Sequence, residues 1–162
     1  MHLPRKALIT AAGAQEGYLY FVATGVQRLY YYDDAHREAT LLFTYAPSFG
    51  GVLDSLLLGQ PARYYYETLT ATHLLRAPRA ALLALMTECP AVATLVRVGV
   101  TAALAGVLER LTEMQCYTAA DRFRQLLRRS PHLLGLIPHK YLASYLGLDA
   151  TTFSKLLATV RI

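Results

Sequence analysis

The residues that could bind a charged partner are concentrated near the carboxyl end of the chain. From Thr118 onward there are two acidic residues, Asp121 and Asp149, and seven basic ones: Arg122, Arg124, Arg128, Arg129, Lys140, Lys155 and Arg161. The first 117 residues hold nine basic and nine acidic residues, so this segment carries the whole formal net charge of +5. A segregated positive charge favours a polyanion such as nucleic acid, and a solvated helix face is the alternative.

Two of these cations lie in a helix-turn-helix pattern. The sequence predicts helices at 139–146 and 150–159, where Gly147 ends the first helix in a left-handed conformation and Asp149 caps the second. Such a motif places its second helix in the major groove of DNA. The predicted DNA-binding residues are Thr151, Thr152, Ser154 and Lys155 on the second helix, with Lys140 and Tyr141 for backbone phosphates. An ordinary helical hairpin with a core of Ala143, Leu146, Leu148 and Phe153 is the alternative.

Catalytic and metal-binding motifs are not found. The five histidines, His2, His36, His73, His132 and His139, have no metal-ligand spacing, and Cys89 and Cys116 are too far apart for a zinc motif or a disulfide framework. No nucleophile elbow and no phosphate-binding glycine loop is present. We therefore predict a protein that is not an enzyme, in a reducing, cytoplasmic compartment.

The elements that position these residues fall into two kinds. With 54% hydrophobic and 17% charged residues, the chain of 162 residues can fold around a real core. Strands are predicted at 18–22, 26–32, 39–45, 63–69 and 71–75, separated by turn residues such as Gly25 and the polar segment 33–38. This spacing is typical of a β sandwich or barrel. Helices are predicted at 79–88, 91–115 and, capped by Thr118, 119–129.

The long helix is apolar on two sides. One stripe consists of Val92, Val96, Val100, Ala103, Val107, Leu111 and Met114, and a second of Leu95, Val98, Ala102, Ala105 and Leu108. One side can cover the β domain and the other favours the same helix of a second copy, which predicts a homodimer. A helix buried within one monomer is the alternative. A membrane span is disfavoured, although 90–108 approaches spanning length, because Arg97 lies near its centre.

This order of elements resembles the Crp/Fnr superfamily of bacterial transcription regulators, which have a cyclic-nucleotide-binding-like sensor domain. The resemblance rests on residues 20–30, 48–51, 59–69, 137–147 and 151–155, and the run from Tyr141 to Leu148 is its most specific part. It implies an α+β fold with an antiparallel, jelly-roll-like β-roll at 1–90, a dimerisation helix at 91–117 and a helix-turn-helix DNA-binding domain at 118–162. Members usually begin with a further helical segment and often end with a winged hairpin, and neither is expected within these residues.

The resemblance also implies an effector pocket, formed here by Phe49, Gly50, Gly51, Ala62, Arg63, Tyr64 and Tyr66. In members that bind cyclic AMP, a glutamate contacts the ribose and an arginine pairs with the cyclic phosphate. Gly51 and Ala62 stand at these two positions. Arg63 comes one residue late, which in a strand reverses the side-chain face. We therefore expect no binding of cyclic AMP, and either an apolar or aromatic effector or a pocket that is only a scaffold.

These features predict a cytoplasmic transcription regulator that binds specific DNA sequences as a homodimer, with the β-roll biasing the placement of the two DNA-binding helices. The cofactor stays unassigned. Two lone cysteines cannot hold an iron–sulfur cluster, and the heme-binding branch of the superfamily remains open. The alternative function is a ligand-binding or protein-interaction module whose terminal helices are truncated or no longer engage DNA.

Overall fold

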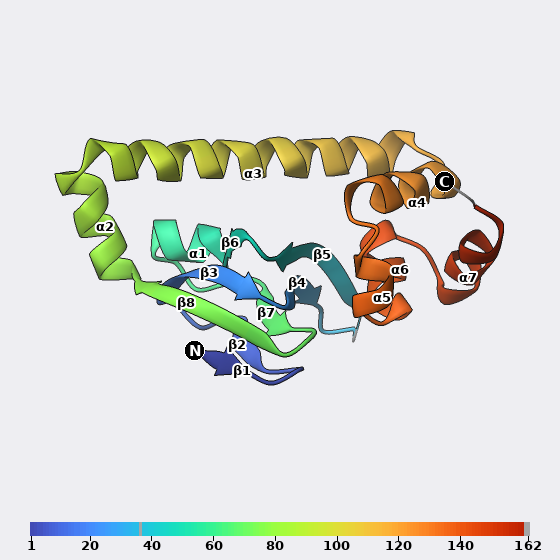
Figure 1. Cartoon of the computed structure of the whole chain (residues 1–162), viewed down its shortest axis with the longest axis horizontal. Coiled ribbons are helices and arrows are strands. Elements are labelled where there is room, and N and C mark those ends of the chain that lie inside the picture. Colours follow the sequence, from blue (N-terminus) through green and yellow to red (C-terminus); the bar gives the residue numbers. More distant parts are fainter. Residues whose placement is uncertain (36, 161–162) are drawn as a thin grey trace. The chain divides into compact units, whose positions relative to one another are not determined.

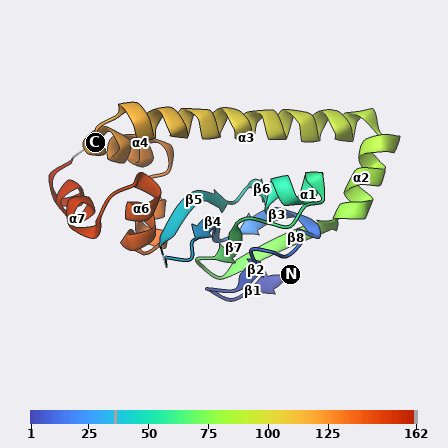
Figure 2. The ribbon, with the colours of Figure 1, turned by 180° about the vertical axis from the view of Figure 1, so that it is seen from behind.

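The computed structural model describes residues 1–35 and 37–160 (Figures 1 and 2). His36, in the predicted polar turn, and Arg161 and Ile162, at the end of the basic segment, lie outside the described residues. The chain divides into two compact units, Met1–Leu82 and Leu83–Ile162. The predicted boundaries after residues 90 and 117 stay predictions.

The first unit contains two antiparallel four-stranded sheets, with strand orders β1-β8-β3-β6 and β2-β7-β4-β5. The strands are β1 (His2–Leu3), β2 (Leu8–Thr10), β3 (Tyr18–Thr24), β4 (Val26–Tyr32), β5 (Glu38–Tyr45), β6 (Ser48–Gly50), β7 (Tyr65–Thr68) and β8 (Thr72–Pro78). A short helix, α1 (Leu53–Leu58), follows β6. This arrangement confirms the predicted antiparallel β-roll.

The core of this unit lies between the two sheets. Tyr20, Val22 and Leu74 contribute from one sheet and Tyr66 from the other. The Gln27 side chain is fully buried, yet its amide donates to Thr72 at 3.0 Å and its carbonyl accepts from Thr44 at 3.0 Å. Paired in this way, a buried amide does not carry the penalty of an unsatisfied polar group.

The strands differ from the sequence prediction mainly at short elements. The two- and three-residue strands β1, β2 and β6 and the six-residue helix α1 were not predicted, because elements this short carry no readable periodicity. Strand β7 begins at Tyr65 rather than at residue 63, and β8 continues to Pro78.

The second unit is helical. Helix α2 (Arg79–Glu88) crosses the boundary between the units, and α3 (Pro90–Cys116) runs straight to a cluster formed by α4 (Ala119–Arg129), α5 (Leu133–Leu136), α6 (His139–Leu146) and α7 (Ala150–Thr159) (Figures 1 and 2). The predicted bounds of α2, α4, α6 and α7 are confirmed. Helix α3 begins at Pro90, which occupies its first turn, where a missing N–H costs nothing. Helix α5 was not predicted.

Capping side chains fix the helix ends as the sequence predicts. The Thr118 hydroxyl accepts from the Asp121 N–H at 3.2 Å at the start of α4, and the Asp149 carboxylate accepts from the Thr152 N–H at 2.8 Å at the start of α7. Gly147 ends α6 with a φ of 64°, a left-handed conformation that favours glycine.

Aromatic and aliphatic side chains pack the helical cluster. Phe123 of α4 and Phe153 of α7 are buried and meet edge to face, with ring centroids 5.4 Å apart. Ala143 and Leu146 are also buried, as predicted, whereas Leu148 is only half-buried. Through Phe153 this core fixes which face of α7 points outward.

Candidate nucleic-acid interface and effector pocket

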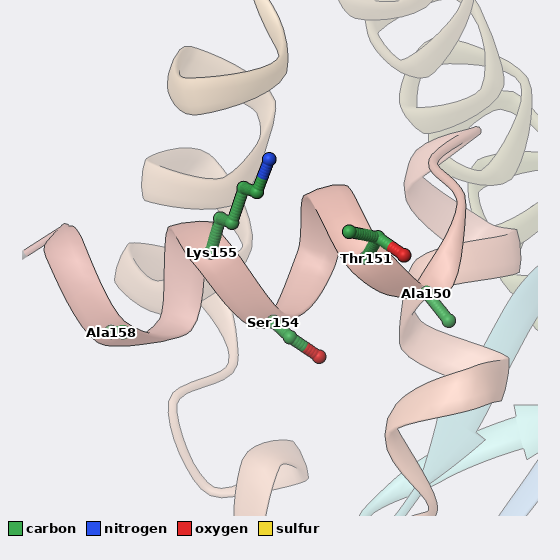
Figure 3. A pocket seen from close by; sticks show the side chains of 5 residues that line it. All are labelled: Ala150, Thr151, Ser154, Lys155 and Ala158. Carbon is green, nitrogen blue, oxygen red and sulfur yellow. The ribbon is translucent and has the colours of Figure 1, made fainter.

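Helix α7 presents a face of small and polar side chains. Thr151, Ser154 and Lys155 are exposed and, together with Ala150 and Ala158, line one shallow open pocket (Figure 3). In that view Thr151 and Lys155 project to one side of the helix and Ala150 and Ser154 to the other. The exposed set lies away from buried Phe153, because Thr151, Ser154 and Lys155, which come two before, one after and two after it, fall on other sides of a helix with 3.6 residues per turn.

Thr152 faces the cap of α7 rather than its exposed face. Its side chain is half-buried, and its hydroxyl donates to the Asp149 carboxylate at 2.7 Å. The Thr152 N–H and hydroxyl, by bonding to the charged form, hold the pKa of Asp149 below its ordinary value. Of the four residues predicted on α7, Thr152 therefore positions the helix and the other three face outward.

The two residues predicted at the start of α6 differ in exposure. Lys140 is exposed, and its Nζ lies 4.7 Å from the centroid of the Tyr141 ring, in a cation–π contact. Tyr141 is buried, with 5% of its surface exposed. Most of the Tyr141 side chain is therefore packed away from solvent, and its contact with phosphate stays a prediction.

A buried carboxylate joins the end of α3 to α4. Glu113 is 3% exposed, and its two carboxylate oxygens accept from the Arg129 guanidinium at 2.7 and 2.9 Å. An Arg110 guanidinium nitrogen lies 3.7 Å from one of these oxygens. Arg110 in turn lies over the ring of Tyr145 of α6 at 4.0 Å. The sequence does not reveal this network, since nothing in the apolar pattern of α3 marks Glu113 as buried.

Two further contacts hold the same end of α3. The Arg122 guanidinium donates to the carbonyls of Met114 at 3.3 Å and Tyr117 at 3.4 Å, where a cation also suits the negative end of the helix dipole. The Met114 side chain packs so closely on Gly147 that a Cβ at Gly147 would overlap it. The last turns of α3, α4 and the α6–α7 turn are thus held together by specific contacts.

In the first unit, the register of β3 and β6 decides which predicted pocket residues face the core. Tyr20 pairs with Gly50 and Phe21 with Phe49. Phe49 is 52% exposed and its ring lies 5.5 Å from that of Phe21, so it points away from the core. Phe49 therefore does not face the core of this unit, and its place in an effector pocket stays a prediction.

Tyr66 fills the space beside Gly50. The Tyr66 side chain is fully buried and its hydroxyl lies 2.7 Å from the Thr44 hydroxyl. A Cβ at Gly50 would overlap the Tyr66 hydroxyl. Burial raises the pKa of the Tyr66 phenol well above its ordinary value, so it is a neutral, hydrogen-bonded wall of the core.

Glu16 lies beside Gly51, a neighbour that the sequence did not predict. It is 2% exposed, and its carboxylate accepts from the Thr10 hydroxyl at 2.6 Å and from the N–H groups of Tyr18 and Val52 at 3.2 Å each. A Cβ at Gly51 would stand 3.5 Å from a Glu16 oxygen, and Gly51 has a φ of 118°. A second carboxylate at this position would face backbone strain and a like charge.

The next segment lacks a cation facing the core. Ala62 is 3% exposed and belongs to the core cluster, whereas Arg63 is exposed and Tyr64 is half-buried against that cluster. The side chains at positions 62 and 63 therefore point in opposite directions, one to the core and one to solvent, as expected, although both residues precede strand β7. The residues present at Gly51 and Ala62 do not fit a cyclic nucleotide, because neither supplies a charged contact for ribose or phosphate.

The sequence of the first unit matches a known family model. Residues 1–89 match the model of the cyclic nucleotide-binding domain. The chain belongs to the cyclic nucleotide-binding domain family. This domain contains the antiparallel β-roll described above, and glycine and alanine stand at positions 51 and 62.

Solved structures resemble the chain along almost its whole length. It is similar to FixK2 from Bradyrhizobium japonicum, with a TM-score of 0.88, 19% identity, and coverage of 98% of this chain and 81% of that one. It is also similar to the catabolite activator protein of Thermus thermophilus, with a TM-score of 0.61, 26% identity, and coverage of 98% and 76%. Another protein of Thermus thermophilus, a transcriptional regulator of the CRP family, has a TM-score of 0.75, 20% identity, and coverage of 98% and 82%.

These similarities confirm the resemblance to the Crp/Fnr superfamily and the predicted order of a β-roll, a long helix and further helices. A search of curated proteins gives no match. Within the described part of the chain, no group of three histidine, cysteine, aspartate or glutamate residues is placed to hold a metal ion.

Proposed function

We propose that the protein is a cytoplasmic transcription regulator of the Crp/Fnr type that binds duplex DNA through α7 and is not an enzyme. The exposed face of α7, held outward by buried Phe153, is the observation that carries this proposal. Exposed Lys140 and Lys155 lie on α6 and α7, whereas Arg124 and Arg129 pair with Asp121 and Glu113. Two exposed cations of this unit therefore lie on the two helices of the proposed DNA-binding motif.

We infer that the regulator acts as a homodimer through α3. An 18-residue window of this helix has a mean hydropathy of 1.9 and is not buried, and its length and composition would also suit a membrane span. Exposed apolar side chains follow the length of α3: Leu95, Val98, Val100, Leu104, Val107, Leu108 and Leu111. A second copy can cover this apolar surface and leave Arg97 in contact with water, whereas a bilayer would have to bury that charge near its centre.

Pairing through α3 also supplies the geometry that DNA recognition needs. The end of α3 is tied to α4 and to the α6–α7 turn through Glu113 and Met114. A dimer axis along α3 would then set the separation of the two α7 helices, which must match half-sites roughly 34 Å apart. An effector that changes the α3 pairing would shift the population of the DNA-binding arrangement.

We propose that cyclic AMP is not the effector. Tyr66 and Glu16 occupy the surroundings of Gly50 and Gly51, and Ala62 supplies no guanidinium. An apolar or aromatic effector, or a β-roll that acts only as a scaffold, agrees with these residues.

The DNA proposal is tested by a salt series. The full chain is titrated onto a labelled random-sequence duplex, and binding is followed by fluorescence anisotropy at rising salt concentrations. Affinity should fall steeply with salt, because bound phosphates release counterions. A protein that binds no duplex even at low salt would instead be the alternative, a β-roll interaction module.

The dimer proposal is tested by sedimentation of two matched variants. Val107→Glu places a charge in the apolar surface of α3, and Val107→Thr at the same position keeps the shape of the side chain without a charge. The position is exposed, so neither variant should unfold the subunit. Val107→Glu should sediment as a monomer and Val107→Thr as a dimer. A wild-type chain that is a monomer at all concentrations, or that partitions into vesicles, would refute the dimer.

A further inference from the structure

The first unit brings together two histidines that lie far apart in the sequence. His2 of β1 and His73 of β8 are direct cross-strand partners, and β1 forms the edge of its sheet beside β8 (Figure 1). Their imidazole rings are stacked, with centroids 4.1 Å apart and an angle of 11° between the ring planes. The spacing of the histidines along the chain, which contains no metal motif, therefore did not reveal this pair.

Both imidazoles lie on the outer face of the sheet, where an ion from solvent reaches them. His2 is exposed and His73 is half-buried. Thr72 and Leu74, on either side of His73, are buried. Because successive side chains of a strand point to opposite faces, the His73 side chain points outward. The pair is therefore part of the surface of the unit and not of its hydrophobic core.

The surroundings of the pair favour the neutral form of imidazole, which is the form that binds a metal ion. Desolvation, the neighbouring His2 ring and the amino group of Met1 hold the pKa of His73 below its ordinary value. Stacking also disfavours double protonation, since two imidazolium charges would face each other at 4.1 Å. The Met1 amino group is itself engaged, because it donates to the Leu74 carbonyl at 2.6 Å. Near neutral pH, His73 therefore offers a lone pair to a metal ion instead of a positive charge.

We infer that His2 and His73 form a binding site for a zinc ion that bridges β1 and β8. Imidazole nitrogen is a preferred ligand of zinc, at a bond length of about 2.0–2.1 Å. Two such bonds in a tetrahedral arrangement hold the two nitrogens roughly 3.3 Å apart. A small rotation of the two rings, whose centroids are now 4.1 Å apart, achieves this separation. Among the described residues no third histidine, cysteine, aspartate or glutamate joins the pair, so water completes the coordination.

The bound ion fastens the amino-terminal strand to the sheet. Strand β1 has two residues, and its ladder to β8 consists of two residue pairs, so few contacts oppose its local opening. Zinc binds both strands at once only when they are paired, and it therefore stabilises the docked strand by linkage. The Leu74 N–H donates to the Met1 carbonyl at 3.0 Å, so its hydrogen exchange reports whether β1 is docked. This inference is independent of the proposed DNA binding.

The site is tested by isothermal titration calorimetry of the full chain with zinc chloride near neutral pH. One ion per chain should bind with a Kd on the order of 10–100 µM, because two of the four ligands of a structural zinc site supply about half of its binding free energy. His2→Gln and His73→Gln should each weaken binding by about tenfold or more, since each removes one of two ligands. His132→Gln is the matched control, because His132 is an exposed histidine of the other unit, and it should bind zinc as the wild type does.

Hydrogen exchange supplies a second readout. Zinc should slow the exchange of the Leu74 N–H in the wild type and leave it unchanged in His2→Gln, a substitution at an exposed position that should not unfold the unit. Zinc that binds equally tightly to His2→Gln and His73→Gln is held elsewhere, for example by Cys89 or Cys116, and refutes the site. A wild-type chain that binds no zinc also refutes it. Either result leaves the proposed DNA-binding function intact.

Discussion

Gly147 forms the turn before α7 and gives the sharpest test of how this helix is positioned. It adopts a φ of 64°, and the Leu148 N–H that follows donates to the Ala143 carbonyl at 2.9 Å. A Cβ at Gly147 would also overlap the Met114 side chain. Gly147→Ala should therefore destabilise the helical unit for two separable reasons.

The magnitude follows from these two reasons. The left-handed conformation costs a residue with a Cβ about 1–2 kcal/mol. Displacing Met114, which is 37% exposed and so has room to move, adds on the order of 1 kcal/mol from lost packing and strain. We expect a total loss of about 2–3 kcal/mol in the free energy of unfolding, with weaker DNA binding because the start of α7 shifts.

The assay is urea unfolding followed by far-ultraviolet circular dichroism, in a double-mutant cycle with Met114→Ala. In the Met114→Ala background Gly147→Ala should cost only the conformational part, about 1–2 kcal/mol. Gly147→Asn is the matched control, because asparagine tolerates the left-handed region better but carries the same Cβ. An identical cost of Gly147→Ala in both backgrounds would show that Met114 does not pack there.

Four further predictions follow from the described contacts. Glu16→Ala should lower the stability of the β-roll by about 2–4 kcal/mol in urea unfolding, because buried N–H donors lose their acceptor, and Glu16→Gln should cost less. Burial raises the pKa of Tyr30 to about 12 and those of Tyr20 and Tyr66 further. Their neutral forms stabilise the fold fully below pH ~10, and stability should fall above it by about 1.4 kcal/mol per pH unit for each fully buried phenol. Tyr66→Phe should reduce this slope in denaturation at alkaline pH, and an unchanged slope would contradict the assignment. Lys140→Ala should reduce the magnitude of the slope of log binding constant against log salt concentration by about 1.8. A dimer loses two phosphate contacts, and each contributes ~0.9 to this slope. Isothermal titration calorimetry with cyclic AMP should show no binding, and micromolar affinity would overturn the account of the pocket.

The helix bounds near the carboxyl end could be predicted because local residues set them. Pro138, Gly147 and Asp149 act within one turn of the helix ends that they define, and α6 and α7 begin and end where these residues predict. The β-roll could be predicted as a class, but not its shortest strands, which exist only through pairing with distant partners such as His2 with His73.

The features of the candidate sites that the sequence did not predict depend on long-range contacts. Glu16 is 36 residues from Val52, whose N–H donates to it, so its place beside Gly51 has no local signal. Glu113 looks like a solvated charge on a helix until Arg129 is placed against it. Phe49 and Tyr141 were assigned from patterns that fix position in the chain and not side-chain exposure.

Gly50, Gly51 and Ala62 agree with our proposal that this domain keeps the family fold without binding cyclic AMP. The β-roll is held by contacts from Tyr66 and Glu16, both buried and hydrogen-bonded within the first unit. The fold therefore has no need of a nucleotide to complete its core. This agrees with a regulator whose signal is another molecule or whose β-roll serves as a scaffold.

The composition of the protein–DNA complex tests the central proposal most directly. A duplex selected from a random library is mixed with the full chain, and the mass of the complex is measured by multi-angle light scattering. Two chains on one duplex, lost together when Val107→Glu separates the copies, is the result expected of paired α7 helices. One chain per duplex, or no complex at low salt, would contradict it.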